Sequence, residues 1–312
     1  MKKIVFLDEY SIAGCDLSSI TSQGDYVAYE NTRKEEVVER LKDADIAITN
    51  KVLIDGEAMR QLPRLKLICV AATGMNNVDL DTARELGIEV KNAVGYSTTS
   101  VAETTLASAL ALARNIVYFN EYFHDGRYAK ADRAFSYDRL TFEIRGKRWG
   151  IIGMGNIGRE VARLASAFGC EVSYYSTSGM VREKAYPALS LETLLYTSDV
   201  VSIHCPLNER TRSLIGAEQL VQMKPSAILI NVARGGIVDE AALAEALNEK
   251  RLRGAALDVF TSEPLRESPL YSLRDPYRLL ASPHNAWSPV EAIDRLIGCI
   301  EQNIAEYVQE HR

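Results

Sequence analysis

The sequence predicts an α/β protein built from two doubly wound parallel sheets, and three observations support this. Short runs rich in β-branched residues alternate with amphipathic helical stretches along the whole chain, a pattern typical of repeated strand–helix units. The chain has 312 residues, which is longer than most single domains and suggests two. A glycine-rich turn near the middle opens the second series of strands, as in sheets that bind an anion at a helix start.

The expected elements follow from this alternation in chain order. The first series of strands is Lys3–Leu7, Tyr26–Glu30, Ile46–Thr49, Leu67–Ala71 and Glu89–Asn92, with helical periodicity at Lys34–Lys42 and Asp81–Leu86. The second series is Trp149–Gly153, Glu171–Ser176, Val200–Cys205, Ala227–Val232, Ala255–Val259 and Leu279–Ser282. Six strands with helices between them fit a complete dinucleotide-binding sheet.

Two long helices are expected outside these series. Ser100 to Phe119 is rich in Ala and Leu and carries no Gly or Pro, which favours one continuous helix. Pro289 to Val308 has apolar residues at helical spacing, so this helix should pack against another element. Glu121 to Phe142, which follows the first long helix, is polar with interspersed aromatics and lacks strand periodicity.

Composition narrows the class of protein. The apolar share of 47% and the charged share of 25% are ordinary for a globular protein. A net charge of −6 disfavours a nucleic-acid partner. The apolar start of the chain is interrupted by Asp8 and Glu9, which favours a buried strand over a signal peptide. No apolar stretch is long enough to cross a bilayer, so we expect a cytoplasmic protein with no membrane partner.

The cysteines indicate a reducing compartment and no metal site. The five are dispersed, with no CxxC and no Cys/His cluster at zinc-ligand spacing; they are Cys15, Cys69, Cys170, Cys205 and Cys299. An odd, scattered set suggests free thiols.

The glycine-rich turn predicts a dinucleotide site. It reads Gly153-Met154-Gly155-Asn156-Ile157-Gly158, follows an expected strand and opens the helix Arg159–Phe168. Gly153 would allow the tight turn, Gly155 the close approach of a pyrophosphate, and Gly158 the contact between helix and strand. Glycines at such turns also occur for structural reasons alone, but here the context fits on both sides.

The end of the next strand leaves the choice of dinucleotide open. Its usual Asp or Glu, which would bind the ribose 2′-hydroxyl, is replaced by Ser176-Thr177-Ser178. Losing the carboxylate removes repulsion against a 2′-phosphate, and Arg182 and Lys184 would add positive charge if the loop folds back. NAD or NADP is therefore expected, with NADP mildly favoured.

Arg234, Glu263 and His284 each follow an expected strand of the second series. Ligands of open parallel sheets bind outside the carboxyl ends of the strands. An arginine offers a planar fork to a carboxylate and polarises a neighbouring carbonyl. A histidine transfers one proton near neutral pH, and a glutamate beside it favours the imidazolium and orients the ring.

Each of these residues alone also has a structural interpretation. Arg234 would serve equally in a surface ion pair, Glu263 as a loop carboxylate before Pro264, and His284 as a structural histidine. Their joint placement at three strand ends of one sheet favours catalysis.

At these residues the sequence resembles the D-isomer-specific 2-hydroxyacid dehydrogenase family. The resemblance covers essentially the whole chain, with matching motifs at Ala72–Asp79, Ser100–Glu103, Gly153–Gly158, Val201–Leu207, Asn231–Asp239, Ala256–Phe260 and Ser282–His284. It implies a flavodoxin-like substrate domain formed by residues 1–98 and 288–312, with a Rossmann NAD(P)-binding domain inserted as residues 99–287. It also implies a homodimer formed through the nucleotide domain.

The resemblance assigns roles to individual residues. Arg234 would bind the substrate, His284 would be the acid/base, and Glu263 would pair with it. Substrate contacts would also come from the loop Thr73-Gly74-Met75 through its backbone N–H groups. The remaining cofactor contacts would be the turn Gly153–Gly158 together with Ser176, Thr177, Cys205, Pro206, Thr211, Val232, Ala233 and Asp258.

Within the family, the Thr73–Asp79 loop and Gly95-Tyr96-Ser97-Thr98 look most like glycerate dehydrogenase and hydroxypyruvate reductase members. We therefore expect a small 2-oxo acid such as hydroxypyruvate or glyoxylate, reduced to the D-2-hydroxy acid (D-glycerate or glycolate). Two alternatives remain. One is a non-catalytic, NAD(H)-sensing protein of the corepressor type; the other is a related dehydrogenase of formate or phosphite.

Overall fold

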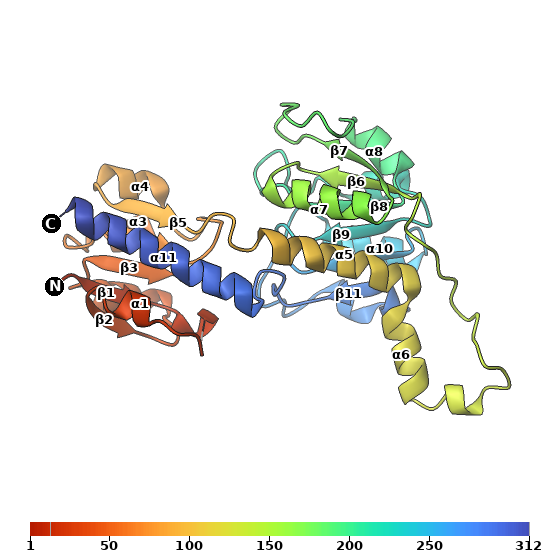
Figure 1. Cartoon of the computed structure of the whole chain (residues 1–312), viewed down its shortest axis with the longest axis horizontal. Coiled ribbons are helices and arrows are strands. Elements are labelled where there is room, and N and C mark those ends of the chain that lie inside the picture. The colour runs from red at the N-terminus through yellow and green to blue at the C-terminus, as the bar shows by residue number, and fades with distance from the viewer. Residues whose placement is uncertain (13, 312) are drawn as a thin grey trace. The chain divides into compact units, whose positions relative to one another are not determined.

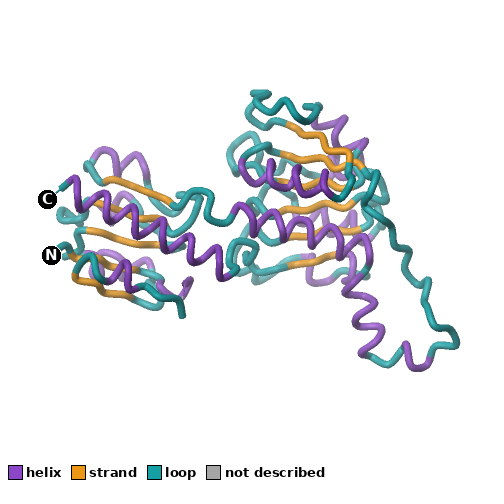
Figure 2. Tube along the Cα trace, viewed as in Figure 1, coloured by secondary structure: helices purple, strands orange, loops and turns teal. Residues whose placement is uncertain are grey.

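The computed structural model describes residues 1–12 and 14–311. They form two compact units: Met1–Ser97 together with Ser288–Arg312, called here the first unit, and Thr98–Trp287, called the second unit. Figures 1 and 2 show a sheet flanked by helices in each unit. The predicted α/β fold with two parallel sheets is thereby confirmed.

The first unit is a five-stranded sheet of order β2-β1-β3-β4-β5, in which every pairing is parallel. Its strands are β1 (Lys3–Phe6), β2 (Asp25–Ala28), β3 (Ile46–Thr49), β4 (Leu67–Val70) and β5 (Glu89–Asn92). Its helices are α1 (Ser18–Thr21), α2 (Val37–Leu41), α3 (Gly56–Arg60), α4 (Leu80–Glu85) and α11 (Val290–Glu310), with 3-10 turns at Glu9–Ile12 and Lys34–Glu36. This is the flavodoxin-like strand order, with its switch point between β1 and β3.

Both faces of this sheet are covered. The C-terminal helix α11 packs on β4 and β5 beside α1, as the apolar spacing of its sequence requires. Side chains of α2, α3 and α4 enclose the other face in one apolar cluster with those of the strands. Because both faces are buried, β3 and β4 are buried at every position, as expected for a central parallel strand.

The second unit is a six-stranded parallel sheet of order β11-β10-β9-β8-β6-β7. Its strands are β6 (Arg148–Ile152), β7 (Glu171–Tyr175), β8 (Val200–Ile203), β9 (Ile228–Asn231), β10 (Gly254–Leu257) and β11 (Leu279–Ala281). Its helices are α5 (Thr98–Arg114), α6 (Ile116–His124), α7 (Asn156–Ala167), α8 (Leu191–Thr197), α9 (Ala217–Gln222) and α10 (Glu240–Asn248), with 3-10 turns at Tyr128–Lys130, Pro269–Ser272 and Pro276–Arg278. A single parallel bridge between Tyr174 and Ala188 extends the sheet beyond β7.

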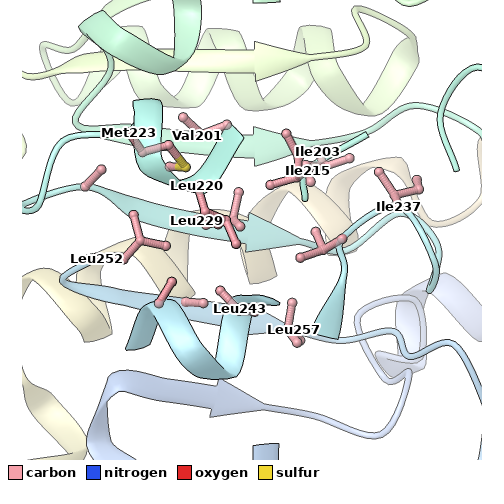
Figure 3. Packing of buried hydrophobic residues seen from close by; sticks show 14 of the residues in the cluster. Val201, Ile203, Ile215, Leu220, Met223, Leu229, Ile237, Leu243, Leu252 and Leu257 are labelled. Carbon is pink, nitrogen blue, oxygen red and sulfur yellow. The ribbon is translucent and has the colours of Figure 1, made fainter. Parts of the chain in front are cut away.

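The second unit has an apolar core on each face of its sheet. Helices α5 and α7 pack on one face. On the other face, side chains of β8, β9 and β10 meet those of α9 and α10, as Figure 3 shows for Val201, Leu229, Leu257, Leu220 and Leu243. Burial of each such side chain contributes roughly 1.5–3 kcal/mol, so the sheet is a rigid base for the loops at its edge.

The prediction of one continuous helix over Ser100–Phe119 is wrong. The chain forms α5 and α6 with a break at Asn115, whose φ of 49° lies in the left-handed region. Asparagine tolerates this conformation better than most residues, and its side-chain amide donates to the carbonyl of Leu140 at 2.9 Å. A tertiary contact therefore breaks a helix that local propensity alone would continue.

None of the helices formed by residues 1–12 and 14–311 is long and apolar enough to cross a membrane. Within the same residues, no group of His, Cys, Asp or Glu side chains is arranged to hold a metal ion.

Candidate active site

The glycine-rich turn lies at the switch point of the second sheet, where the strand order reverses between β6 and β8. Gly153 has φ of 95°, and a Cβ there would lie 2.8 Å from the backbone nitrogen of Cys205, which follows β8. A Cβ on Gly158 would lie 2.3 Å from the carbonyl oxygen of Gly153. Both positions therefore require glycine to bring α7 and the two strand ends together.

Gly155 differs from these two glycines. It caps α7, and a Cβ built there would meet nothing within 4 Å. Its missing side chain thus leaves open space in front of the helix start, where free N–H groups and the helix dipole attract an anion. This open cradle fits the pyrophosphate of a dinucleotide.

A cavity of about 790 Å³ opens at this edge of the sheet. Seven of the predicted cofactor residues line it: Gly153, Met154, Gly155, Ser176, Thr177, Cys205 and Pro206. Asn156, Ile157 and Gly158 form the first turn of α7 behind it. Its volume is within the range of sites for a cofactor or small molecule.

The other predicted cofactor residues do not line this cavity. Val232 and Ala233 directly follow β9. Thr211 is fully buried, and its hydroxyl donates to the carbonyl of Pro206 at 2.7 Å and accepts from the amide of Asn208 at 2.8 Å. Thr211 therefore braces the loop that carries Pro206.

Hydroxyl groups follow β7 at the cavity, and arginines line the cavity as well. Ser176 donates to the carbonyl of Met180 at 2.8 Å, so the chain turns back across the end of β7. Arg182 and Arg210 line the cavity, and neither forms an ion pair among the residues that the structure describes. Two acids, Glu183 and Glu209, line the same cavity. Glu183 is paired with Arg159 at 3.2 Å, and hydrogen bonds from Ala185 and Arg159 lower its pKa.

Arg234 lies on a tight turn after β9. Asn231, the last residue of that strand, accepts from the amide of Ala233 at 3.1 Å and donates to the carbonyl of Arg234 at 2.9 Å. A Cβ on Gly235 would lie 1.8 Å from the carbonyl oxygen of Phe260. The turn that carries Arg234 thus packs directly against the loop that carries Glu263.

Glu263 and His284 form the pair that the sequence predicted. The distance between Nδ1 of His284 and Oε2 of Glu263 is 2.7 Å. The other carboxylate oxygen of Glu263 accepts from the amide of Phe260 at 3.0 Å. Because Nδ1 is engaged by the carboxylate, Nε2 is the ring atom that remains for proton transfer.

His284 is held in an unusual backbone conformation. Its φ of 57° lies in the left-handed region, and its amide donates to the carbonyl of Asp258 at 2.8 Å. Asp258 itself is buried, and its carboxylate accepts from Ser282, Asn285 and Ala286 at 2.6–3.0 Å. In the structure, Asp258 braces the loop of His284. Backbone strain of this kind is found at sites where surrounding contacts enforce one geometry.

The predicted substrate residues Thr73, Gly74 and Met75 lie in a loop of the first unit, beyond the carboxyl end of β4. The hydroxyl of Thr73 donates to the carbonyl of Ala93 at 3.1 Å, and Asn92 donates to the carbonyl of Thr73 at 2.6 Å. The loop is therefore tied to the chain that leaves β5.

Sequence reasoning did not single out His204, Arg159 or Arg210, all of which line the cavity. The two ring nitrogens of His204 are buried and form no hydrogen bond with any described residue. Burial lowers the pKa of His204 to about 3, so this ring is neutral near pH 7. Their positions in the sequence could have indicated a role in the site, because His204 directly follows strand β8 and Arg159 lies one turn into helix α7.

Known proteins resemble this chain along its length. Residues 106–286 match the family model of the D-isomer specific 2-hydroxyacid dehydrogenase NAD binding domain. The chain is 39% identical to a glycerate dehydrogenase of Methylorubrum extorquens, over 98% of this chain and 96% of that protein. It is 33% identical to a hydroxypyruvate reductase of Blautia hydrogenotrophica, over 98% of this chain and 97% of that one.

A solved structure agrees with these sequence matches. The acyclic imino acid reductase Bsp5 in complex with NADPH and D-Arg superposes with a TM-score of 0.87 at 30% identity, covering 99% of this chain and 97% of that one. The fold, the dinucleotide cradle and these matches together show a nicotinamide-dependent oxidoreductase acting on CH–OH donors, and the chain belongs to the D-isomer-specific 2-hydroxyacid dehydrogenase family.

Proposed function

We propose that the chain reduces a small 2-oxo acid, hydroxypyruvate or glyoxylate, to the D-2-hydroxy acid. The Glu263–His284 pair carries the proposal. A carboxylate 2.7 Å from Nδ1 fixes the orientation of the ring and aims Nε2 away from itself. The similarity to the glycerate dehydrogenase and the hydroxypyruvate reductase supports the choice of substrate.

Arg234 would act on two groups of the substrate, its carboxylate and the neighbouring carbonyl. Its guanidinium forms no ion pair with any described residue, so it is available to a substrate carboxylate in the bidentate manner of arginine. The same charge would polarise the neighbouring carbonyl. His284 would donate its Nε2 proton to the carbonyl oxygen, which becomes the hydroxyl oxygen of the product.

Bound nicotinamide, when reduced, supplies the hydride that this reduction needs at the carbonyl carbon. The residues proposed to hold the dinucleotide are the turn Gly153–Gly158, Ser176, Thr177, Cys205 and Pro206, with Thr211, Val232, Ala233 and Asp258 supporting them. We propose that the second unit binds the cofactor and that the first unit, through Thr73, Gly74 and Met75, binds the substrate. NADP is the proposed preference because serine replaces the acid after β7 and Arg182 and Arg210 line the same cavity.

We also propose that the chain forms a homodimer. The arm, defined as residues 116–142, exposes a series of large apolar side chains: Ile116, Val117, Phe123, Tyr128, Phe135, Tyr137 and Leu140. A run of this kind exceeds what a monomer normally leaves in water. A second copy of the chain is the proposed occupant, because the family resemblance places a dimer interface on this domain.

The first test is turnover. Oxidation of NADH and NADPH should be followed with hydroxypyruvate, glyoxylate, pyruvate and phenylpyruvate as substrates. His284→Ala should lower kcat by at least about 100-fold, the usual range for loss of a general acid, while binding of the reduced dinucleotide, followed by its fluorescence, is retained. Absence of turnover with every 2-oxo acid would favour the non-catalytic sensor, and equal loss of both properties would make His284 structural.

A further inference from the structure

The loop Thr73–Met75 presents backbone N–H groups that the protein itself does not use. Among the described residues, the amides of Thr73, Gly74 and Met75 donate to no acceptor. These groups lie past the carboxyl end of β4, the edge at which parallel sheets bind ligands. Successive free amides form a cradle for an anion only if the backbone that carries them is held still.

The side chain of Asn77 holds the far end of this loop. Its Nδ2 donates to the carbonyl of Val52 at 3.1 Å, and it lies 3.4 Å from the carbonyl of Asn50 and from Oγ1 of Thr49. The carbonyl of Asn77 accepts from the amide of Ile54 at 2.8 Å. One side chain thus ties the loop after β4 to the loop after β3.

The loop after β3 is itself fixed from β1. Asp8, fully buried at the end of β1, accepts from the amides of Asn50, Lys51 and Val52 at 2.9, 2.6 and 3.3 Å. The strands β1 and β3 flank the switch point of the first sheet. The chain of contacts therefore runs from the rigid sheet through Asp8 and the 50–52 loop to Asn77.

We propose that Asn77 is a positioning residue for the substrate carboxylate, acting through the amides of Thr73, Gly74 and Met75. The inference rests on the proposed function, since the anion it serves is the carboxylate of the 2-oxo acid. Asn77 needs to touch neither substrate nor cofactor. Its donors fix the loop because the carbonyls of Asn50 and Val52 can only accept, and a carboxylate of the same size would be repelled there.

The test is a matched pair of variants at adjacent asparagines. Asn77→Asp keeps the size but replaces the N–H donors with a charged oxygen that faces the carbonyl oxygens of Asn50 and Val52. Asn76→Asp makes the same change at an exposed side chain that has no hydrogen bond within the described chain. KM for hydroxypyruvate and the inhibition constant of oxalate should both rise about tenfold in Asn77→Asp, the equivalent of one lost buried hydrogen bond. Both should change less than twofold in Asn76→Asp.

The dissociation constant of the reduced dinucleotide serves as the internal control. It should stay within twofold in both variants, because the proposed cofactor site lies in the other unit. A change confined to kcat, or equal effects at positions 76 and 77, would overturn the proposal.

If Asn77→Asp does not fold, Thr49→Val removes one partner of Asn77 and should also raise KM. An unchanged KM in Thr49→Val would also overturn the proposal. A wild type without turnover would instead overturn the proposed function, and this inference with it.

Discussion

At the scale of single residues, we propose that the end of the cavity beside β7 determines the choice between NAD and NADP. Ser176→Asp would place a carboxylate directly after β7, where it accepts from ribose hydroxyls and repels a 2′-phosphate. The ratio of kcat/KM with NADPH to that with NADH should fall about 10- to 100-fold, the range expected for a hydrogen bond to a charged group. Steady-state kinetics with both cofactors measure it. An unchanged ratio would mean that Ser176 does not face the ribose.

The role of a side chain that directly follows a strand could be predicted from the sequence. A property that depends on contacts with distant parts of the chain could not. Glu263 and His284 are 21 positions apart, yet both follow neighbouring strands, so period-2 patterning and the parallel-sheet rule bring them to one edge. His204 also follows a strand, but nothing in the sequence reveals that its ring nitrogens are buried without partners. Burial of a side chain at a strand end depends on the loop folded over it.

At the scale of elements, the arm provides the test of assembly. Phe135 and Tyr137 are 63% and 75% exposed and contact each other edge to face. Aromatic anchors at the centre of an interface commonly contribute at least about 2 kcal/mol each, so Tyr137→Asp should raise the dimer dissociation constant about 30-fold or more. Sedimentation equilibrium measures this shift. Tyr196→Asp alters a tyrosine outside the arm that is similarly exposed, at 72%, and should leave the dimer intact. If both variants raise the dimer dissociation constant equally, the arm does not form the interface.

The start of the arm also shows where sequence-based prediction of elements ends. All eleven expected strands are present, and the apolar runs of the central strands β3, β4, β8 and β9 reflect their burial at every position. The break between α5 and α6 was missed because no Gly or Pro marks it. It depends on Asn115 reaching Leu140, 25 positions away. The short helices α1 and α3, of four and five residues, were also missed, since one turn carries too little periodicity to detect.

At the scale of the whole molecule, the two units can be followed separately. Both tryptophans, Trp149 and Trp287, belong to the second unit, and Trp149 is fully buried in its core, so tryptophan fluorescence reports the unfolding of that unit. The first unit takes its strands from the beginning of the chain and α11 from the end. The first unit therefore needs both ends of the chain, and the C-terminal helix α11 completes it by packing on β4 and β5.

We expect the stability of the second unit to depend on pH through His204, whose ring nitrogens are buried. Its pKa is lowered from 6.5 to about 3 by burial, so the unfolded chain takes up a proton at a higher pH than the folded chain. The stability gained from the neutral ring is fully present above pH 6.5 and is lost as the pH falls toward 3. Between pH 7 and 5, this loss amounts to about 2 kcal/mol in the free energy of unfolding. The free energy of unfolding should be measured at pH 7 and at pH 5 by urea unfolding without cofactor, followed by tryptophan fluorescence. Between these two pH values, wild type should lose about 2 kcal/mol more of it than His204→Leu or His204→Asn, whose side chains do not titrate there. Parallel losses in all three proteins would show that His204 is protonated in the folded state.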